Sequence, residues 1–324
     1  MTSSTPQTPV HVINYDAGGY DYRDFWQGRD YEQWAEVHVI RRILRRTTPV
    51  QWAVDLGGGF GRNVPLELER AQHVVLMDYS WTNLQNAEHN LLADGQNTGR
   101  VFLVRGNIYH LPFRDASFEL GSTIRVLHHL AATNDAIAEM SRVIGQHWLL
   151  DVPIKHHLLA RMKAAVRGKG SALRTRDANE LGNKDEPFWN YHLGAIRDEV
   201  RAQGWSDSLV ASVANFRRWE RAVPRPLRGP VRPLVYGAER LAQPMGRGWW
   251  GPAQFLWLTK RQQQAFADSE SVLGTPPAAV AALAPRLWCP SCHGNLTWTD
   301  ASATCTACAK PFTRQGMIWD FVVE

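Results

Sequence analysis

The stretch VDLGGGFGRN, residues 54–63, decides the fold of this 324-residue chain. An apolar run leads into three alternating glycines, Gly57, Gly59 and Gly61, and a helical segment follows. Because glycine lacks a Cβ, a ligand can lie directly on such a turn between strand and helix. The spacing is not the dinucleotide fingerprint G-x-G-x-x-G, since Arg62 stands where that motif has its last glycine. No P-loop lysine follows either, so the pattern disfavours a nucleotide-phosphate site.

Strands and helices alternate around this loop. Apolar runs predict strands at 54–56, 73–78, 100–106, 118–124, 147–153, 206–217 and 253–261. Helices are expected from about 34 to 46 and near 62–71, 81–93, 133–144 and 188–203. Residues 224–252 are rich in Pro, Gly and Arg and show no clean period. This rhythm predicts an α/β fold with a parallel sheet that helices cover on both faces.

Asp78 ends the strand at 73–78, the position at which such folds place a carboxylate that binds a ribose. A carboxylate can accept hydrogen bonds from two vicinal hydroxyls at once. Asp55 precedes the glycines, so the full pattern is D-x-G-x-G-x-G. These features predict a ribose-binding site, and the alternative is a tight loop beside a surface carboxylate.

The stretch 54–151 resembles the class I S-adenosylmethionine-dependent methyltransferases, in the small-molecule branch called type 11. VDLGGGFGRN, VVLMDYS and the segment 106–130 carry the resemblance, which extends over residues 20–260. It implies a Rossmann-like fold and S-adenosyl-L-methionine as the cofactor. The residues that it assigns to the methionine portion are Asp55, Gly57, Gly59 and Gly61, with Asp78 at the ribose and Asn107 and Ile108 at the adenine. The family usually has Asp where Asn107 stands, but the amide oxygen of Asn can still accept a hydrogen bond.

Two further groups are candidates for the site. In this family an N-terminal segment often closes over the cofactor, and Tyr22 and Arg29 could do so here; alternatively, these aromatic and charged residues pack a helix on the sheet. His128 and His129 follow the fourth strand, where an imidazole could accept a proton from the methyl acceptor. Leu-His-His-Leu also occurs in this family without a catalytic role. Methyl transfer often needs only proximity and in-line geometry, because the sulfonium is already activated.

All the cysteines of the chain lie in two C-x-x-C pairs near its end, Cys289 with Cys292 and Cys305 with Cys308. Such pairs can supply four thiolates to one Zn²⁺, and the alternatives are a redox pair or a disulfide pair. Residues 287–322 resemble the Trm112-like zinc ribbons, a family that commonly partners methyltransferases of the translation machinery. A segment this short has no adequate core, so metal binding would supply most of its folding energy.

The predicted organisation has four parts. They are a flexible tail at 1–19, a methyltransferase domain at 20–262 with a basic insert at 155–187, a linker at 263–286 and a zinc ribbon at 287–324. The linker predicts that the ribbon folds independently. No apolar run is long enough to span a bilayer, and the N-terminus lacks the features of a signal peptide, which predicts a soluble, cytoplasmic protein. No sequence feature indicates an oligomeric state.

Three hypotheses of function follow. The first is methylation of a small-molecule metabolite, with an acceptor pocket formed by the insert and the Trp-rich segment 236–257. The second is methylation of rRNA or tRNA, which the ribbon, the net charge of +5 and the basic insert favour. The third is a non-catalytic cofactor-binding partner protein. The Asn/Asp-Pro-Pro-Tyr motif of enzymes that methylate amino groups of bases is absent after the fourth strand, where Thr123-Ile124-Arg125-Val126 stands.

Overall fold

The computed structural model describes residue 16 and residues 21–93, 95–168, 170–182, 187–266 and 273–323. Apart from residue 16, the predicted tail at 1–19 lies outside the described residues. No helix in these ranges is both long enough and apolar enough to cross a membrane.

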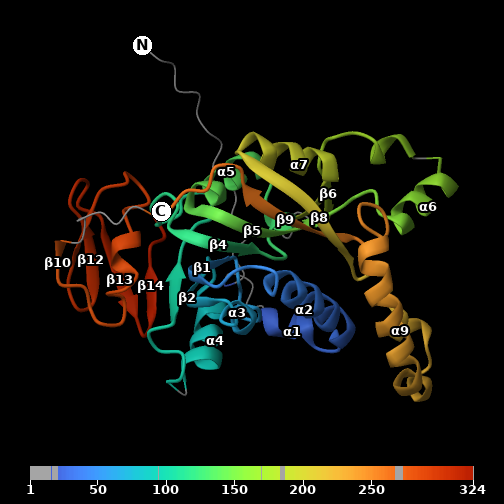
Figure 1. Cartoon of the computed structure of the whole chain (residues 1–324), viewed down its shortest axis with the longest axis horizontal. Coiled ribbons are helices and arrows are strands. Elements are labelled where there is room, and N and C mark those ends of the chain that lie inside the picture. The colour runs from blue at the N-terminus through green and yellow to red at the C-terminus, as the bar shows by residue number, and fades with distance from the viewer. Residues whose placement is uncertain are drawn as a thin grey trace, which may run out of the picture.

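A twisted sheet forms the centre of the molecule (Figure 1). Its strands in the first 262 residues are β1 (Val50–Leu56), β2 (Ala71–Asp78), β3 (Val101–Arg105), β4 (Phe118–Thr123), β5 (Ile144–Pro153), β8 (Trp205–Val213) and β9 (Ala253–Lys260). They lie in the order β3-β2-β1-β4-β5-β9-β8. The strands β1 to β5 are parallel, as predicted.

The prediction of a parallel sheet does not hold at one end, where β9 runs antiparallel to both β5 and β8. The register pairs Val213, the last residue of β8, with Ala253, the first of β9. The excursion between these strands therefore leaves and rejoins the sheet at the same end. A chain that returns in this way can only run back in the opposite direction.

Helices cover both faces of the sheet (Figure 1). One face carries α1 (Tyr22–Trp26), α2 (Asp30–Leu44), α3 (Val64–Glu67) and α4 (Trp81–Leu92), and the other carries α5 (Thr133–Val143) and α7 (Leu193–Ala202). Each layer has its own buried apolar cluster, with Ile40 and Leu84 in the first and Ile137 and Ile196 in the second. The strands between them are buried on both sides, which explains their continuous apolar runs.

Two segments differ from the prediction. The predicted helix at 188–203 begins as a strand, because β7 (Pro187–Asn190) pairs with β6 (Asn179–Gly182) and the helix α7 starts only at Leu193. The segment without a clean period, residues 224–252, contains a long helix, α9 (Arg225–Met245), which packs against β8 and α2 and follows the short helix α8 (Trp219–Ala222). Its prolines argue against a helix, but tertiary packing of one face overrides intrinsic propensity.

The C-terminal module continues the same sheet. Its strands are β10 (Leu273–Gly274), β11 (Leu296–Trp298), β12 (Ser302–Cys305), β13 (Pro311–Gln315) and β14 (Ile318–Asp320). β14 pairs in parallel with β3, so one sheet of twelve strands runs through the described chain (Figure 1). Phe321 and Val280 are buried in the same apolar cluster as Ile137. Edge pairing and a shared core thus join the ribbon to the larger domain, which argues against the predicted independent folding.

Candidate functional site

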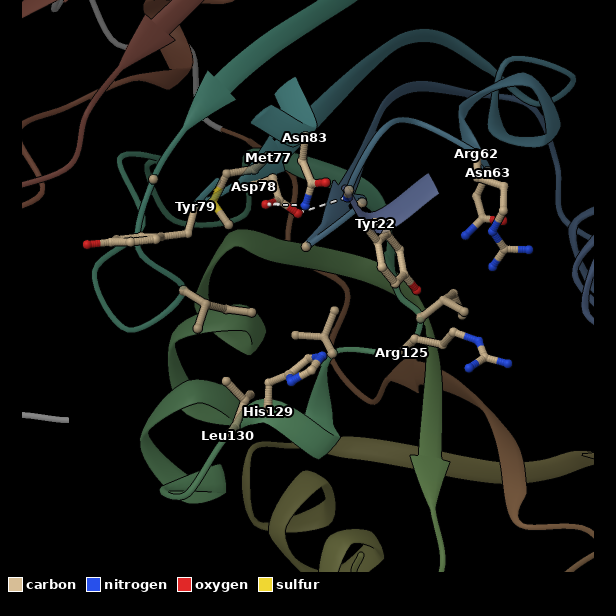
Figure 2. Close-up of a pocket in the computed structure, with 17 residues that line it drawn as sticks. Tyr22, Arg62, Asn63, Met77, Asp78, Tyr79, Asn83, Arg125, His129 and Leu130 are labelled. Carbon is tan, nitrogen blue, oxygen red and sulfur yellow. Dashed lines mark hydrogen bonds between the residues drawn. The ribbon is translucent and has the colours of Figure 1, made fainter. Parts of the chain in front are cut away.

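The glycine loop forms one wall of a cavity of about 850 Å³, including its open mouth, at the carboxyl ends of β1, β2 and β4. Figure 2 shows Asp78 and Asn83 opposite His129 and Leu130, with Tyr22 beside them. Gly57, Gly58 and Gly59 also line this cavity, which we call the first cavity. The full set of lining residues is Tyr22, Gly57, Gly58, Gly59, Arg62, Asn63, Met77, Asp78, Tyr79, Asn83, Gly106, Ile108, Ile124, Arg125, Val126, His129 and Leu130.

The loop needs glycine for steric reasons. Gly57 and Gly59 have φ of 75° and 58°, in the left-handed region that disfavours other residues. A Cβ on Gly57 would lie 2.5 Å from Val126 Cγ2, and one on Gly58 would lie 2.1 Å from a methyl group of Leu76. Glycine is therefore required at these positions if the backbone of the loop is to approach a ligand closely.

Asp78 holds the loop in place and presents its carboxylate to the first cavity. Its oxygens accept hydrogen bonds from the backbone N–H groups of Gly59 (2.8 Å) and Ser80 (2.9 Å) and from the amide of Asn83 (3.3 Å). A carboxylate has about four acceptor sites, so capacity for a ligand hydroxyl remains. Burial raises the pKa of Asp78 from its ordinary value, although the hydrogen bonds oppose this shift.

The structure places the predicted cofactor residues in two groups. Tyr22, Gly57, Gly59, Asp78, Ile108 and His129 line the first cavity. Asp55, Gly61, Asn107, Arg29 and His128 do not line it.

Asp55 lies behind the loop. The Ser122 hydroxyl bridges its carboxyl group, at 2.9 Å, to that of Glu67. A hydroxyl carries a single proton to donate, so one of the two carboxyl groups must itself be protonated. Burial raises the pKa of Asp55 to about 6 and that of Glu67 well above its usual range, which fits this requirement. Asp55 therefore packs against the loop, with its Oδ2 2.5 Å from where a Cβ on Gly58 would stand.

Sequence reasoning missed an ion-pair network beside the first cavity. Glu36, on the buried face of α2, accepts from Arg62 (2.7 Å) and from Arg125 (2.6 Å). Burial alone would raise the pKa of Glu36, but the two guanidinium groups outweigh it and hold the pKa below its ordinary value. The feature of the sequence that could have indicated this network is a glutamate on the apolar face of a helix. Both arginines line the first cavity, so Glu36 fixes part of its wall.

Arg125 also lines a second cavity, of about 1160 Å³ including its mouth. The other residues of this second cavity are Phe25, Arg29, Glu32, His128, Asp151, Pro153, His157, Leu181, Phe188, Asn190, Ala214, Arg217, Pro252 and Ala253. They come from α1, the start of α2, the turn after β4, the ends of β5 and β8, β7, the start of β9 and the basic insert. The two cavities are thus neighbours that share one wall residue.

Asp151, at the end of β5, is the second residue that sequence reasoning missed. It is 4% exposed, and one carboxyl oxygen accepts from the backbone N–H of Arg125 at 3.3 Å. The other oxygen, Oδ1, has no hydrogen-bond partner among the residues that the structure describes. Burial and then the nearby Glu36 carboxylate raise the pKa of Asp151 to about 7. A carboxyl group with this pKa can both accept and release a proton near neutral pH.

The two histidines are less suited to proton transfer at neutral pH. The rings of His128 and His129 lie 3.9 Å apart between centroids, and His128 stacks on Phe188. Burial lowers the pKa of His129 to about 4, and burial, His129 and Arg125 lower that of His128 well below its ordinary value. The pKa of a general base should lie near the working pH, so Asp151 fits this role better than either histidine.

We expect Asp151→Asn to stabilise the protein at alkaline pH. The folded state raises the pKa of Asp151 from its ordinary value of 3.8 to about 7, so it favours the neutral carboxyl group. This contribution to stability is complete below pH 4 and is lost as the pH rises through 7. One pKa unit corresponds to about 1.36 kcal/mol, so the free energy of unfolding of the variant should exceed that of the wild type by up to about 4 kcal/mol at pH 8. At pH 4 the two should be equal.

Urea unfolding at pH 4.5, 6 and 8 measures this difference. Asp300→Asn is the matched control, because Asp300 is exposed in the ribbon and its carboxyl group stays in water in both states. A pH-independent difference between Asp151→Asn and the wild type would contradict the assigned ionisation.

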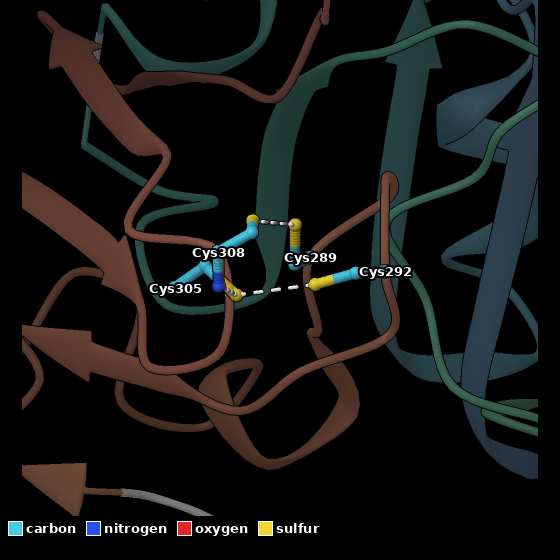
Figure 3. Close-up of side chains that lie close together, drawn as sticks. All are labelled: Cys289, Cys292, Cys305 and Cys308. Atoms are coloured by element: carbon cyan, nitrogen blue, oxygen red, sulfur yellow. Dashed lines mark hydrogen bonds between the residues drawn. The ribbon is translucent and has the colours of Figure 1, made fainter.

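The four cysteines lie close together at one end of the ribbon (Figure 3). The sulfur atoms of Cys289 and Cys308 are 3.6 Å apart, those of Cys292 and Cys305 are 3.4 Å apart, and all four lie within 4.8 Å of one another. These distances are too long for disulfides. They are close to the S···S separation of about 3.8 Å that follows from tetrahedral Zn–S bonds of about 2.3 Å. The donor set and its spacing therefore fit one zinc ion.

The comparisons with known proteins agree with this geometry. Residues 54–147 match the family model described as a methyltransferase domain. Over 94 residues, 28% of this chain, the sequence is 35% identical to a putative methyltransferase of Encephalitozoon cuniculi. The match spans 39% of the length of that relative.

Solved structures with a similar fold include a chain from the complex between the Haloferax volcanii Trm112 methyltransferase activator and the putative methyltransferase. Its TM-score is 0.50 at 16% identity, and the match covers 79% of this chain and 100% of that one. A Thermotoga maritima S-adenosylmethionine-dependent methyltransferase, a possible histamine N-methyltransferase, has a TM-score of 0.48 at 14% identity, covering 76% and 98%. The chain thus contains a methyltransferase domain with a Rossmann-like α/β fold, which confirms the sequence prediction at this level.

Proposed function

We propose that the protein transfers a methyl group from S-adenosylmethionine to a small-molecule acceptor. The observation that carries this proposal is the adjacency of two cavities. The first has a glycine loop and a buried carboxylate, Asp78, and the second has the buried carboxyl group of Asp151. Arg125 belongs to both. A cofactor in one and an acceptor in the other would meet at Arg125, which is the proximity that methyl transfer requires.

The residues of the first cavity fit the cofactor. S-adenosylmethionine supplies an activated methyl group on a sulfonium. Asp78 would accept from the ribose hydroxyls, and Ile108 would pack on the adenine. The bare backbone of Gly57 to Gly59 would leave room for the methionine portion. Tyr22 of α1 would close the site, since its ring lies over Gly59, 3.2 Å from where a Cβ would stand.

The residues of the second cavity would orient the acceptor and remove its proton. Asp151 would accept the proton of an attacking hydroxyl or amine at its Oδ1, while Oδ2 stays bonded to the Arg125 backbone. Phe25 and Phe188 provide apolar walls that exclude water from the reaction. The cavity also draws His157 and Leu181 from the insert, and Pro252 and Ala253 from the segment 236–257, which supports an acceptor pocket between these two segments.

We further propose that the C-terminal module is a Trm112-like zinc ribbon. The four thiolates of Cys289, Cys292, Cys305 and Cys308 would hold Zn²⁺ in a closed structural site. In the Haloferax volcanii complex the activator and the methyltransferase are partners. Here the corresponding module would be part of the same chain, joined to β3 through β14.

RNA methylation is the second candidate function. The exposed cations of the basic insert favour it, since neutralising phosphates is the main source of affinity for RNA. Incubation with labelled S-adenosylmethionine and cell extract, followed by separation into small molecules, RNA and protein, tests both candidates. Label in the small-molecule fraction supports the proposal, and label in RNA overturns it. Absence of turnover together with cofactor binding would support the third hypothesis, a non-catalytic partner protein.

Asp78→Ala should weaken S-adenosylmethionine binding by about 10- to 150-fold, because charge-assisted hydrogen bonds contribute about 1.5–3 kcal/mol. The substitution also removes the acceptor of the Gly59 N–H group, which loosens the loop. Isothermal titration calorimetry measures the affinity. Asp300→Ala, an exposed ribbon variant, is the control and should bind like the wild type. Unchanged affinity in Asp78→Ala would exclude the assignment to the ribose.

A further inference from the structure

A third cavity adjoins the second and also opens at the surface. We call it the outer chamber, and it has a volume of about 910 Å³ including its mouth. Its residues are His157, Leu158, Leu159, Met162, Lys163, Ala214, Asn215, Arg217, Arg218, Trp250 and Pro252. Four of these, His157, Ala214, Arg217 and Pro252, also line the second cavity. The three cavities thus form a row in which each cavity adjoins the next.

The outer chamber opens on helix α6 (Leu158–Val166), which has no buried residue. Leu159, Met162 and Val166 recur at intervals of three and four, so they share one face of the helix. They are 49%, 58% and 90% exposed. Large apolar side chains on one face of a helix are ordinarily buried, so this face is unpartnered.

The apolar surface continues from α6 to the end of α9. The backbone N–H of Leu158 donates to Trp250 O at 3.2 Å, and the rings of Trp250 and Trp249 lie 5.4 Å apart. Trp249 Nε1 donates to Met245 O at 3.1 Å. Trp249 and Met245 are 40% and 71% exposed. We call Leu159, Met162, Met245 and Trp249 the apolar patch. Figure 1 shows α6 and α9 on the same side of the molecule, away from the ribbon.

Cations border this patch. Lys163, Arg217 and Arg218 line the outer chamber, and none of its lining residues is acidic. No ion pair of Arg217 is present among the residues that the structure describes. The sequence of the insert from 155 to 176 contains lysines and arginines but no Asp or Glu. The surface around the chamber is therefore both apolar and positively charged.

The combination of apolar and cationic side chains distinguishes between RNA and a membrane as the partner of this surface. RNA binds cationic surfaces with polar or stacking side chains, and exposed Leu and Met side chains would gain nothing from phosphates. An anionic bilayer matches both features, because it takes apolar side chains at its boundary and attracts Lys and Arg at its surface. Aromatic residues such as Trp249 also favour that boundary. No described helix could span the bilayer, so contact would be peripheral.

From this juxtaposition, and resting on the proposed function, we infer that the methyl acceptor is an amphiphile drawn from an anionic membrane surface. The apolar patch lies in the bilayer boundary, and Lys163, Arg217 and Arg218 contact the anionic headgroups. The apolar part of the acceptor occupies the outer chamber, along Leu158 and Met162. Its nucleophilic group reaches Asp151 in the second cavity.

Vesicle flotation tests this inference with full-length protein and two kinds of vesicle, phosphatidylcholine alone and phosphatidylcholine with phosphatidylglycerol. We expect binding to the anionic vesicles to be at least about tenfold stronger, since each cation near the surface favours binding. The double variant Leu159→Asp/Met162→Asp should lose this binding. Leu273→Asp is the matched control, because Leu273 is 43% exposed on β10 in the C-terminal module, and it should bind like the wild type.

A second variant, Lys163→Glu/Arg218→Glu, should lose the preference for anionic vesicles. It provides an independent test if the first variant misfolds. Failure of the wild type to bind either vesicle would overturn the inference, as would equal losses in Leu273→Asp. The wild type could instead bind a short RNA and no vesicle, with the Lys163→Glu/Arg218→Glu variant losing the RNA. That result would overturn the membrane inference in favour of RNA. Calorimetry with S-adenosylmethionine on the same samples separates these failures from failure of the proposed function, which would appear as loss of cofactor binding.

Discussion

Removal of the zinc ion that we propose for the four-cysteine cluster is expected to destabilise the whole chain and not the ribbon alone. Structural zinc contributes about 10–16 kcal/mol to the folding of small zinc modules. Here the module shares a sheet with the methyltransferase domain, through the pairing of β14 with β3. It also shares a buried cluster, which includes Phe321 and Leu287. We therefore expect a strong chelator to lower the melting temperature of the single unfolding transition by more than about 10 °C.

Chelation should also weaken cofactor binding. Asp320 of the ribbon forms an ion pair with Arg105 at 3.0 Å, and Arg105 Nε donates to the backbone oxygen of Tyr79 at 2.9 Å. Tyr79 lines the first cavity next to Asp78. A ribbon that unfolds releases Arg105, so the cofactor wall loses a support.

Differential scanning calorimetry and elemental analysis, with and without chelator, measure these effects. Cys305→Ser should reproduce them, because a hydroxyl is a much poorer zinc ligand than a thiolate. Ser291→Ala is the matched control, since it changes an exposed hydroxyl between two of the cysteines and leaves every thiolate in place. Absence of metal in freshly purified, reduced protein would refute the zinc site. Two separate transitions, with an unchanged one for the methyltransferase domain, would refute the coupling.

Glu36→Ala should destabilise the protein by about 3–5 kcal/mol, because it leaves two largely buried arginines without their counterion. The side chains of Arg62 and Arg125 are 9% and 21% exposed, and both approach Glu36 within 2.7 Å. Since both also line the first cavity, the variant should bind S-adenosylmethionine more weakly. Urea unfolding and calorimetry measure the two effects.

The matched control is Glu69→Ala, which removes an exposed partner of Arg41 and should cost less than about 1 kcal/mol. Glu36→Gln gives a test by pH. The pKa of Glu36 is lowered in the folded state, so its contribution is present above about pH 4.3 and fades as the pH falls further. The wild type should therefore lose its advantage over Glu36→Gln in acid. Equal costs for Glu36→Ala and Glu69→Ala would contradict the role of the network.

Several features could be predicted from the sequence because they are local. The strand, the glycine loop and Asp78 lie within 25 residues of chain, and their contacts follow from strand geometry and the absence of Cβ atoms. The cysteine pairs are also local, and their spacing alone predicts a cluster, which the structure brings within 4.8 Å. The strands β1 to β5 were found because burial on both faces makes them apolar throughout.

Other expectations failed where long-range packing decides the outcome. The helix α9 forms despite three internal prolines, because β8 and α2 bury part of its surface. The linker led to the prediction that the ribbon folds alone, but a linker in the sequence does not show which edge of the sheet is free for pairing. β3 is such an edge, and its unpaired N–H and C=O groups accept β14.

The sequence by itself determined the class of fold, the turn on which a ligand can lie, the carboxylate beside it and the donor set for a metal. Only the tertiary structure decided that Glu36 joins Arg125 across 89 residues, that Arg105 joins Asp320 across 215, and that Asp151 is buried where its pKa rises to about 7. The physical reason is the range of the interactions. Backbone geometry and ligand spacing act over a few residues, whereas ion pairing, desolvation and edge pairing depend on which distant segments the folded chain brings together.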